Sequence, residues 1–196
     1  MTPERKDKIE TVLLNRQPHL ALVMENVHDH HNISAVMRTC DAVGIQDIYV
    51  LNTKIPRHEY FGVKSSSSAA KWLTVHHFDD TEKCFKNLRH RYEHIYATHL
   101  GENAKSVYEI DFSKSIALVF GNEHEGVTKE AVALSDGCFI IPQVGMIQSL
   151  NISVACAVTI YEAYRQKKIA GHYDQTLPLH PEYKLLAEQW AKKKTK

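Results

Sequence analysis

Short apolar runs alternate with amphipathic patterns along most of the chain, and this alternation limits the folds open to it. Strand-like runs occupy residues 20–25, 48–51, 72–75, 94–98, 116–120 and 138–141. Helical patterns occupy residues 33–43, 81–91, 129–134 and 150–170, and Asp79 or Asp80 and Thr128 are candidate N-caps. Such alternation predicts an α/β protein with a mainly parallel sheet flanked by helices. From these residues alone we expect an open, doubly wound sheet, because threaded chains are rare.

Two further helices are predicted at the ends of the chain. Thr2 and Pro3 suit the start of a helix over about residues 2–16. A proline-containing linker precedes a second helical pattern over about 180–193. Because 43% of the residues are apolar, the chain can build a true core. We therefore interpret residues 1–196 as a single domain with short helical extensions at both ends.

Charge and targeting signals give a weak indication of function. The formal net charge is +1 and the sequence pI is about 7.8, so composition does not predict a nucleic-acid-binding protein. Basic residues cluster at Arg5, Lys6 and Lys8, at Arg165, Lys167 and Lys168, and at Lys192 to Lys196. Solubility and phosphate contact are both open explanations for these clusters. The sequence shows neither a signal peptide nor a membrane-spanning apolar run, and we expect a cytoplasmic protein.

Cysteines and histidines do not form a recognisable metal site. The four cysteines are widely spaced within apolar patterns, and we interpret them as reduced core residues. Thirteen histidines include His28, His30 and His31, followed later by His76 and His77. No second ligand pair stands at a familiar zinc spacing, so we expect no functional metal.

The segment 140–158 leads from a strand through a turn with Pro142 and Gly145 into a helix. Ser149 and Asn151 lie at the start of this helix, where main-chain N–H groups are unpaired and the helix dipole is positive. Capping and ligand binding are both possible roles for them. One apolar stripe is expected to anchor the helix to the core: Leu150, Val154, Ala157, Val158, Tyr161 and Tyr164.

Two earlier segments also combine a helix or strand end with glycine or asparagine. The sequence LVFGNEHEGV at 118–127 ends a strand and contains Gly121, Asn122, Glu123 and Gly126. The sequence HNISAVMRTCDAVG at 31–44 predicts a helix that ends at Gly44, with Asn32 as a plausible cap. The side chains of Ile33, Val36, Met37 and Cys40 are expected to be buried, and Ser34 and Arg38 to share another face.

Together, and in this order, the three segments resemble the three motifs of the SpoU branch of the SPOUT RNA 2'-O-methyltransferases, the SpoU/TrmH family. The likeness also covers the segments SSSSAAKW and YATHL, and it extends over roughly residues 17–173. It is strongest to the family members that methylate the D-loop guanosine of tRNA. The resemblance implies a trefoil knot over about residues 118–160 and a homodimer whose active sites use both subunits. Spacing alone indicates neither feature.

The resemblance also implies a donor, an acceptor and the residues that hold them. The chain has no G-x-G-x-x-G fingerprint after its first strand, and the implied cofactor is S-adenosylmethionine. The family pattern places cofactor binding at Thr98, Leu100, Gly121, Asn122, Glu123, Gly126, Ile141 and Leu150. It places catalysis at Asn32, Arg38, Glu123, Ser149 and Asn151. For tRNA binding we expect contributions from His31, Arg5, Lys8, Arg16, Arg165 and Lys168, and the serine-rich patch at 62–70 is either a loop along RNA or a plain connector.

Arg38 has the clearest mechanistic role in this hypothesis. A guanidinium has no acceptor atom at neutral pH, so a phosphate clamp suits Arg38 at least as well as the role of base. Asn32 would orient Arg38 or the substrate. Wobble-nucleotide and ribosomal-RNA methylases of the same family are alternatives, although chain length favours the D-loop enzyme. An inactive RNA-binding dimer is a further alternative, and the presence of all five motif residues argues against it.

Overall fold

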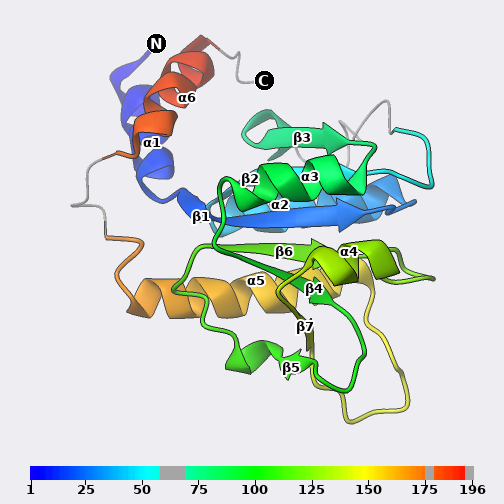
Figure 1. The fold of residues 1–196 in the computed structure, drawn as a ribbon. Helices are drawn as coiled ribbons and strands as arrows, with labels where there is room; N and C mark the ends of the chain where they lie inside the picture. The colour runs from blue at the N-terminus through cyan, green and yellow to red at the C-terminus, as the bar shows by residue number, and fades with distance from the viewer. Residues whose placement is uncertain (58–68, 175–178, 193–196) are drawn as a thin grey trace.

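The computed structural model describes residues 1–57, 69–174 and 179–192 (Figure 1). Its helices are α1 (Pro3–Leu14), α2 (His30–Ala42), α3 (Thr81–Arg89), α4 (Lys129–Leu134), α5 (Ile152–Ile169) and α6 (Pro181–Lys192), with 3-10 turns η1 (Ala69–Lys71) and η2 (Val107–Glu109). Its strands are β1 (Gln17–Glu25), β2 (Ile45–Leu51), β3 (Thr74–Phe78), β4 (His94–Thr98), β5 (Lys105–Ser106), β6 (Ile116–Phe120) and β7 (Gly137–Ile140). Most of the serine-rich patch at 62–70 lies outside the described residues.

The strands form one sheet in the order β3-β2-β1-β6-β4-β7-β5, and every pair of neighbours is parallel. This confirms the predicted mainly parallel sheet flanked by helices. β3 begins at Thr74, two residues later than the run at 72–75 suggests. β5 has no counterpart in the prediction, because its two residues are too few to give a periodic pattern.

Both faces of the sheet are buried, as a parallel sheet requires. Successive side chains of a strand point to opposite faces. Leu20, Leu22 and Met24 of β1 therefore join the core beneath α2 and α5, whereas Ala21 and Val23 join the core beneath α3 and α4. Each fully buried aliphatic side chain contributes roughly 1.5–3 kcal/mol, so these two layers hold the strand ends in place.

The start of α2 differs from the prediction. Asp29, not Asn32, is the N-cap, and its side chain accepts a hydrogen bond from the His31 main-chain N–H at 2.8 Å. Asn32 lies inside the first turn, and its amide is therefore free to bond elsewhere. The expectation for Ser34 is also wrong, because it is buried and does not share the exposed position of Arg38. Ser34 is adjacent to Ile33, and the buried face of α2 is wide enough to include both side chains.

The buried face of α5 is not the predicted stripe. The helix packs on the sheet through Ile152, Cys156, Ile160 and Ala163, which repeat at the spacing of one helix face. Val154 and Tyr161 of the predicted stripe are 47% and 52% exposed. Because α5 is apolar on two faces, periodicity could not decide which face meets the sheet.

The terminal helices α1 and α6 lie side by side at one end of the molecule (Figure 1). They share a small core of Ile9, Leu13, Tyr183 and Trp190. Thr2 caps α1 and Pro3 is in its first turn, as predicted. The four cysteines are free thiols, three of them buried. None of the helices in the described part of the chain combines the length and apolar character needed to span a membrane.

Candidate active site

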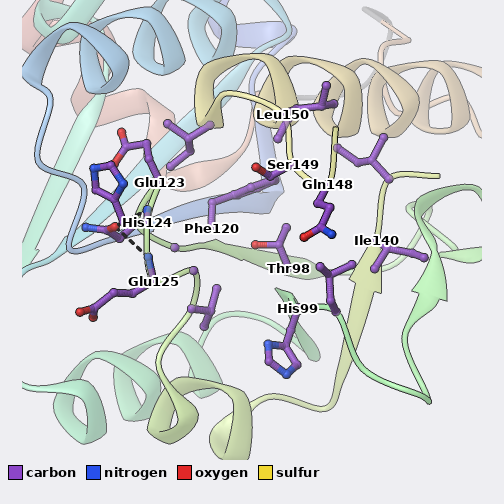
Figure 2. A pocket seen from close by; sticks show the side chains of 18 of the residues that line it. Thr98, His99, Phe120, Glu123, His124, Glu125, Ile140, Gln148, Ser149 and Leu150 are labelled. Atoms are coloured by element: carbon purple, nitrogen blue, oxygen red, sulfur yellow. Dashed lines mark hydrogen bonds between the residues drawn. The ribbon is translucent and has the colours of Figure 1, made fainter. Parts of the chain in front are cut away.

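A cavity of about 410 Å³ opens at the carboxyl ends of β4, β6 and β7 (Figure 2). Ligands of parallel α/β proteins bind at this edge of the sheet. Phe120, Phe139, Leu150 and Ile152 give it apolar walls, while Thr98 and the loops after β6 and β7 add polar groups. We call this cavity the crevice. Its volume and mixed lining suit a small organic ligand.

The loop after β6 forms one wall of the crevice and depends on two glycines. A Cβ atom at Gly121 would collide with the main-chain carbonyl group of Gly126. Gly126 has a φ of +69°, a left-handed conformation that glycine adopts at little cost. An antiparallel bridge between Asn122 and Gly126 closes the turn. The path of this wall therefore depends on glycine at both positions.

A chain of hydrogen bonds joins the three motif segments at one side of the crevice. The Asn32 amide donates to Glu123 Oε1 at 2.7 Å, and Asn151 Nδ2 donates to Asn32 Oδ1 at 3.2 Å. Asn151 also caps α5 by accepting from the Ser153 main-chain N–H at 2.8 Å. The structure thus brings Asn32, Glu123 and Asn151 together from three distant parts of the chain. Asn151 serves as a cap as well as a partner of Asn32.

All eight residues expected to bind the cofactor line the crevice. They are Thr98, Leu100, Gly121, Asn122, Glu123, Gly126, Ile141 and Leu150, and Ser149 of the expected catalytic set lies with them. Leu100 is 71% exposed and sits at the rim. Figure 2 also places His99, His124 and Gln148 around the cavity, and the sequence analysis does not include these. Each of the three is adjacent in the sequence to a residue expected in the site, and this adjacency is the signal that could have identified them.

Arg38 does not line the crevice. It is exposed on α2, and no hydrogen bond or ion pair joins it to another residue within the described ranges. The amide of Asn32 bonds to Glu123 and accepts from Asn151, so it does not orient Arg38 within this chain. The alternative that Asn32 orients the substrate stays a prediction.

The basic residues expected to bind tRNA divide into exposed and buried ones. Lys8, Lys168 and His31 are exposed, and Arg5 is half-buried with its guanidinium donating to the Trp190 carbonyl oxygen at 3.3 Å. Arg165 is exposed but forms a two-pronged ion pair with Glu162 of the same helix.

Arg16 corrects the prediction, because it is buried, and Lys167 of the basic cluster at 165–168 is buried as well. The Arg16 guanidinium pairs with Asp41 at 2.5 Å and lies over the Trp190 ring, so it holds helices together and does not face RNA. Lys167 donates from Nζ to the Lys114 carbonyl oxygen at 3.2 Å. Burial lowers the pKa of Lys167 to about 8.

Ionisable groups lie on the loop after β6 and at the start of α2. Lys54 forms an exposed ion pair with Glu125 at 2.5 Å, and this hydrogen bond lowers the pKa of the Glu125 carboxyl group. Among the described residues, one trio has metal-ligand atoms within 4.8 Å of one another: Asp29, His30 and His31, all exposed. The positive end of the α2 dipole lies beneath this trio and disfavours a cation there.

The fold and crevice define a parallel α/β protein with a cavity for a small molecule at the carboxyl ends of three strands. Residues 19–161 match the model of the SpoU rRNA Methylase family. The chain is 42% identical over 195 residues to the tRNA (guanosine(18)-2'-O)-methyltransferase of Thermus thermophilus, covering 98% of each protein. The protein therefore belongs to the SpoU methylase family.

Solved structures agree with this membership. The A. aeolicus TrmH/SpoU tRNA modifying enzyme superimposes with a TM-score of 0.87 at 33% identity, over 96% of this chain and 95% of that one. An AdoMet-bound rRNA methyltransferase from Sinorhizobium meliloti superimposes with a TM-score of 0.69 at 25% identity, over 78% of this chain and 59% of that one. The second protein was crystallised with the methyl donor.

Proposed function

We propose that this protein transfers a methyl group from S-adenosylmethionine to the ribose 2'-oxygen of the D-loop guanosine of tRNA in the cytoplasm. The observation that carries this proposal is the crevice, because the loops of the second and third motif segments line it together with the loop after β4. The substrate assignment is supported by identity over nearly the full length to a relative named for guanosine 18 of tRNA.

The crevice fits the proposed donor. Its volume of about 410 Å³ falls in the range of pockets that enclose small cofactors. Main-chain groups near Gly121, Ile141 and Leu150 can bond a polar adenosyl edge, while Phe120 and Leu150 offer apolar surface to a ring. When bound, S-adenosylmethionine supplies an electrophilic methyl group on a sulfonium.

The residues of the chain then position the acceptor. Glu123, Asn32 and Asn151 hold the motif loops in register through their hydrogen bonds. The planar guanidinium of Arg38 offers several N–H donors, so it would bind the phosphate of the target nucleotide and stabilise negative charge on the attacking oxygen. Alignment of the 2'-oxygen with the methyl group accounts for a large part of the rate enhancement.

A second copy of the chain is proposed to complete each site. Val154 and Tyr161 on α5 are exposed, and Val144, Met146 and Ile147 in the adjoining loop are also exposed. An apolar surface of this kind marks an interface. Because Arg38 is exposed and outside its own crevice, we place it in the crevice of the partner subunit.

The dimer has a direct test with a matched control. Val154→Glu should shift the protein to monomers in light scattering and abolish methyl transfer. Leu185→Glu adds the same charge at an exposed leucine of α6, away from α5, and should leave both unchanged. A Val154→Glu protein that remains dimeric would refute the proposed interface.

We also propose that the chain is knotted over about residues 118–160 and forms a single domain. β4 lies between β6 and β7 in the sheet, and the loop at 121–126 faces the segment 148–150 across the crevice, which is the arrangement a knot over residues 118–160 would need. A single domain should unfold in one cooperative transition seen alike by fluorescence and circular dichroism. Two separated transitions would contradict the single-domain proposal.

Methyl transfer to a panel of RNAs tests the function and its alternatives. We expect tritium from the labelled donor to be incorporated into unmodified tRNA. Incorporation should be abolished when the D-loop guanosine carries a 2'-deoxyribose, because the acceptor hydroxyl is then missing. Transfer to the modified tRNA, with label at the wobble nucleotide, or to ribosomal RNA instead, would favour the other family activities. Failure to bind S-adenosylmethionine in calorimetry would favour an inactive RNA-binding dimer.

A further inference from the structure

The residue that follows β1 lies behind the crevice wall and does not line it. Asn26 is 3% exposed and has a φ of +51°, the one positive φ at a non-glycine residue within the described ranges. Asparagine tolerates this left-handed conformation better than most residues. The conformation lets its side chain and its carbonyl group serve two different loops.

The side chain of Asn26 holds the loop that leaves β2. Its Oδ1 accepts hydrogen bonds from the main-chain N–H groups of Thr53 and Lys54, both at 2.9 Å. Its Nδ2 donates to Thr53 Oγ1 at 3.1 Å. Both ends of the amide are therefore used on one short turn.

The main chain of Asn26 holds the crevice wall. Its carbonyl oxygen accepts from Asn122 Nδ2 at 2.9 Å in a buried hydrogen bond. Asn122 Oδ1 in turn accepts from the main-chain N–H groups of His124 at 2.6 Å and Glu125 at 3.1 Å. The position of Asn26 thus determines where Asn122 sits, and Asn122 determines the path of the next three residues.

Two neighbouring contacts also hold the loop at 121–128 in place. The buried Glu25 carboxylate accepts from the Thr128 main-chain N–H at 2.8 Å and from Thr128 Oγ1 at 2.6 Å, which fixes the end of the loop at the start of α4. The ion pair of Lys54 with Glu125 links the two loops on the outside. The loop at 121–128 is consequently held at both ends by the end of β1.

We propose that Asn26 is a positioning residue for donor binding. By holding Asn122 through its carbonyl group and the β2 loop through its amide, it keeps the main chain of residues 121–126 in the shape that receives S-adenosylmethionine. A wall that is already ordered loses less conformational entropy when the ligand binds. This inference rests on the proposed function, because it assigns Asn26 to the same donor site.

Asn26→Gly separates the side-chain bonds from the backbone conformation, since glycine accepts a positive φ. We expect this variant to bind S-adenosylhomocysteine about tenfold more weakly in calorimetry, as outer-shell substitutions do at other sites. Its affinity for tRNA in the absence of donor should stay within about twofold of that of wild type. A general structural defect would instead weaken the binding of both tRNA and S-adenosylhomocysteine.

Asn52→Gly is the matched control. Asn52 follows β2 directly, is buried, and bonds the Pro56 carbonyl oxygen at 3.3 Å in the same loop, without a bond to the crevice wall. We expect its affinity for S-adenosylhomocysteine to stay within about twofold of wild type. Equal losses in the two variants, or no loss in Asn26→Gly, would overturn the role of Asn26.

Amide hydrogen exchange on the wild-type protein tests the same point if Asn26→Gly does not fold. The His124 and Glu125 amides should be protected without donor, because Asn122 already binds them. Exchange at the rate of an open loop would overturn the proposal. Wild-type protein that does not bind S-adenosylhomocysteine would instead contradict the proposed function.

Discussion

Replacing Asn32 with aspartate puts a second carboxylate against Glu123. The Asn32 amide now donates to Glu123 Oε1 at 2.7 Å, and in Asn32→Asp an oxygen would take the place of that nitrogen. Two carboxylates at this separation do not both stay ionised, so the pair should hold one proton at a raised pKa. The motif segments would then be joined only when that proton is bound.

The size of the effect follows from the geometry. Two unit charges about 4 Å apart repel by about 4 kcal/mol at an effective dielectric constant near 20. Both side chains are half-buried, and solvent screening reduces this to on the order of 2 kcal/mol, or about 1.5 pKa units. A carboxyl group that normally titrates near about 4.3 should therefore take up its proton near about pH 6.

Asn32→Ala is the control, because it loses the same hydrogen bond and adds no charge. The assay is kcat/KM for methyl transfer to tRNA between about pH 5.5 and 8.5. The ratio of the Asn32→Asp value to the Asn32→Ala value should rise about tenfold as the pH falls from about 8 to 5.5. Parallel pH profiles for the two variants would show instead that the bond to Glu123 does not matter to the site.

Three other substitutions test the packing of the loop after β6, the burial of Lys167 and the role of Arg38. Gly121→Ala should reduce donor affinity by more than about tenfold, because the added Cβ atom would collide with Gly126 and open the loop after β6; an affinity equal to that of wild type would contradict the packing argument. Burial lowers the pKa of Lys167 to about 8, against about 10.4 in the unfolded chain, so the stability contributed by this group is lowest below pH 8 and rises between about 8 and 10.4. Lys167→Met should thus unfold at higher urea than wild type at about pH 7 and lose this advantage toward about pH 10, and an advantage independent of pH would contradict the burial argument. Arg38→Lys keeps the positive charge but cannot donate two parallel hydrogen bonds to a phosphate. Turnover on saturating tRNA should therefore fall by at least about tenfold, and near-normal turnover would exclude two-pronged phosphate binding by Arg38.

The sheet and the crevice could be predicted from the sequence more closely than the helix faces. Strong apolar runs predict β4 and β6 at their observed bounds, because these central strands lie between neighbours on both sides. The α5 prediction is wrong at the level of the face: Val154 and Tyr161 are apolar yet exposed, while Ile152 and Cys156 meet the sheet. Because α5 has a second apolar face that is exposed, the periodicity of its apolar residues does not identify the face that packs on the sheet.

Charged residues are the other source of error. Arg16 is expected to contact tRNA and Lys167 to belong to a surface cluster, because arginine and lysine are seldom fully buried. Their partners, Asp41 and the Lys114 carbonyl oxygen, lie 25 and 53 residues away in the sequence, so local patterns could not indicate the pairing. No local pattern indicates Asn26 for a similar reason, since its importance depends on Asn122, 96 residues further on.

We expect the loops after β4, β6 and β7 to form one site for the methyl donor. A crystal structure of the protein with S-adenosylhomocysteine measures this directly. The ligand should lie between Thr98, Gly121 and Leu150, with Arg38 of a second copy facing it. Density for the ligand elsewhere, or a crevice filled by protein atoms, would contradict the account.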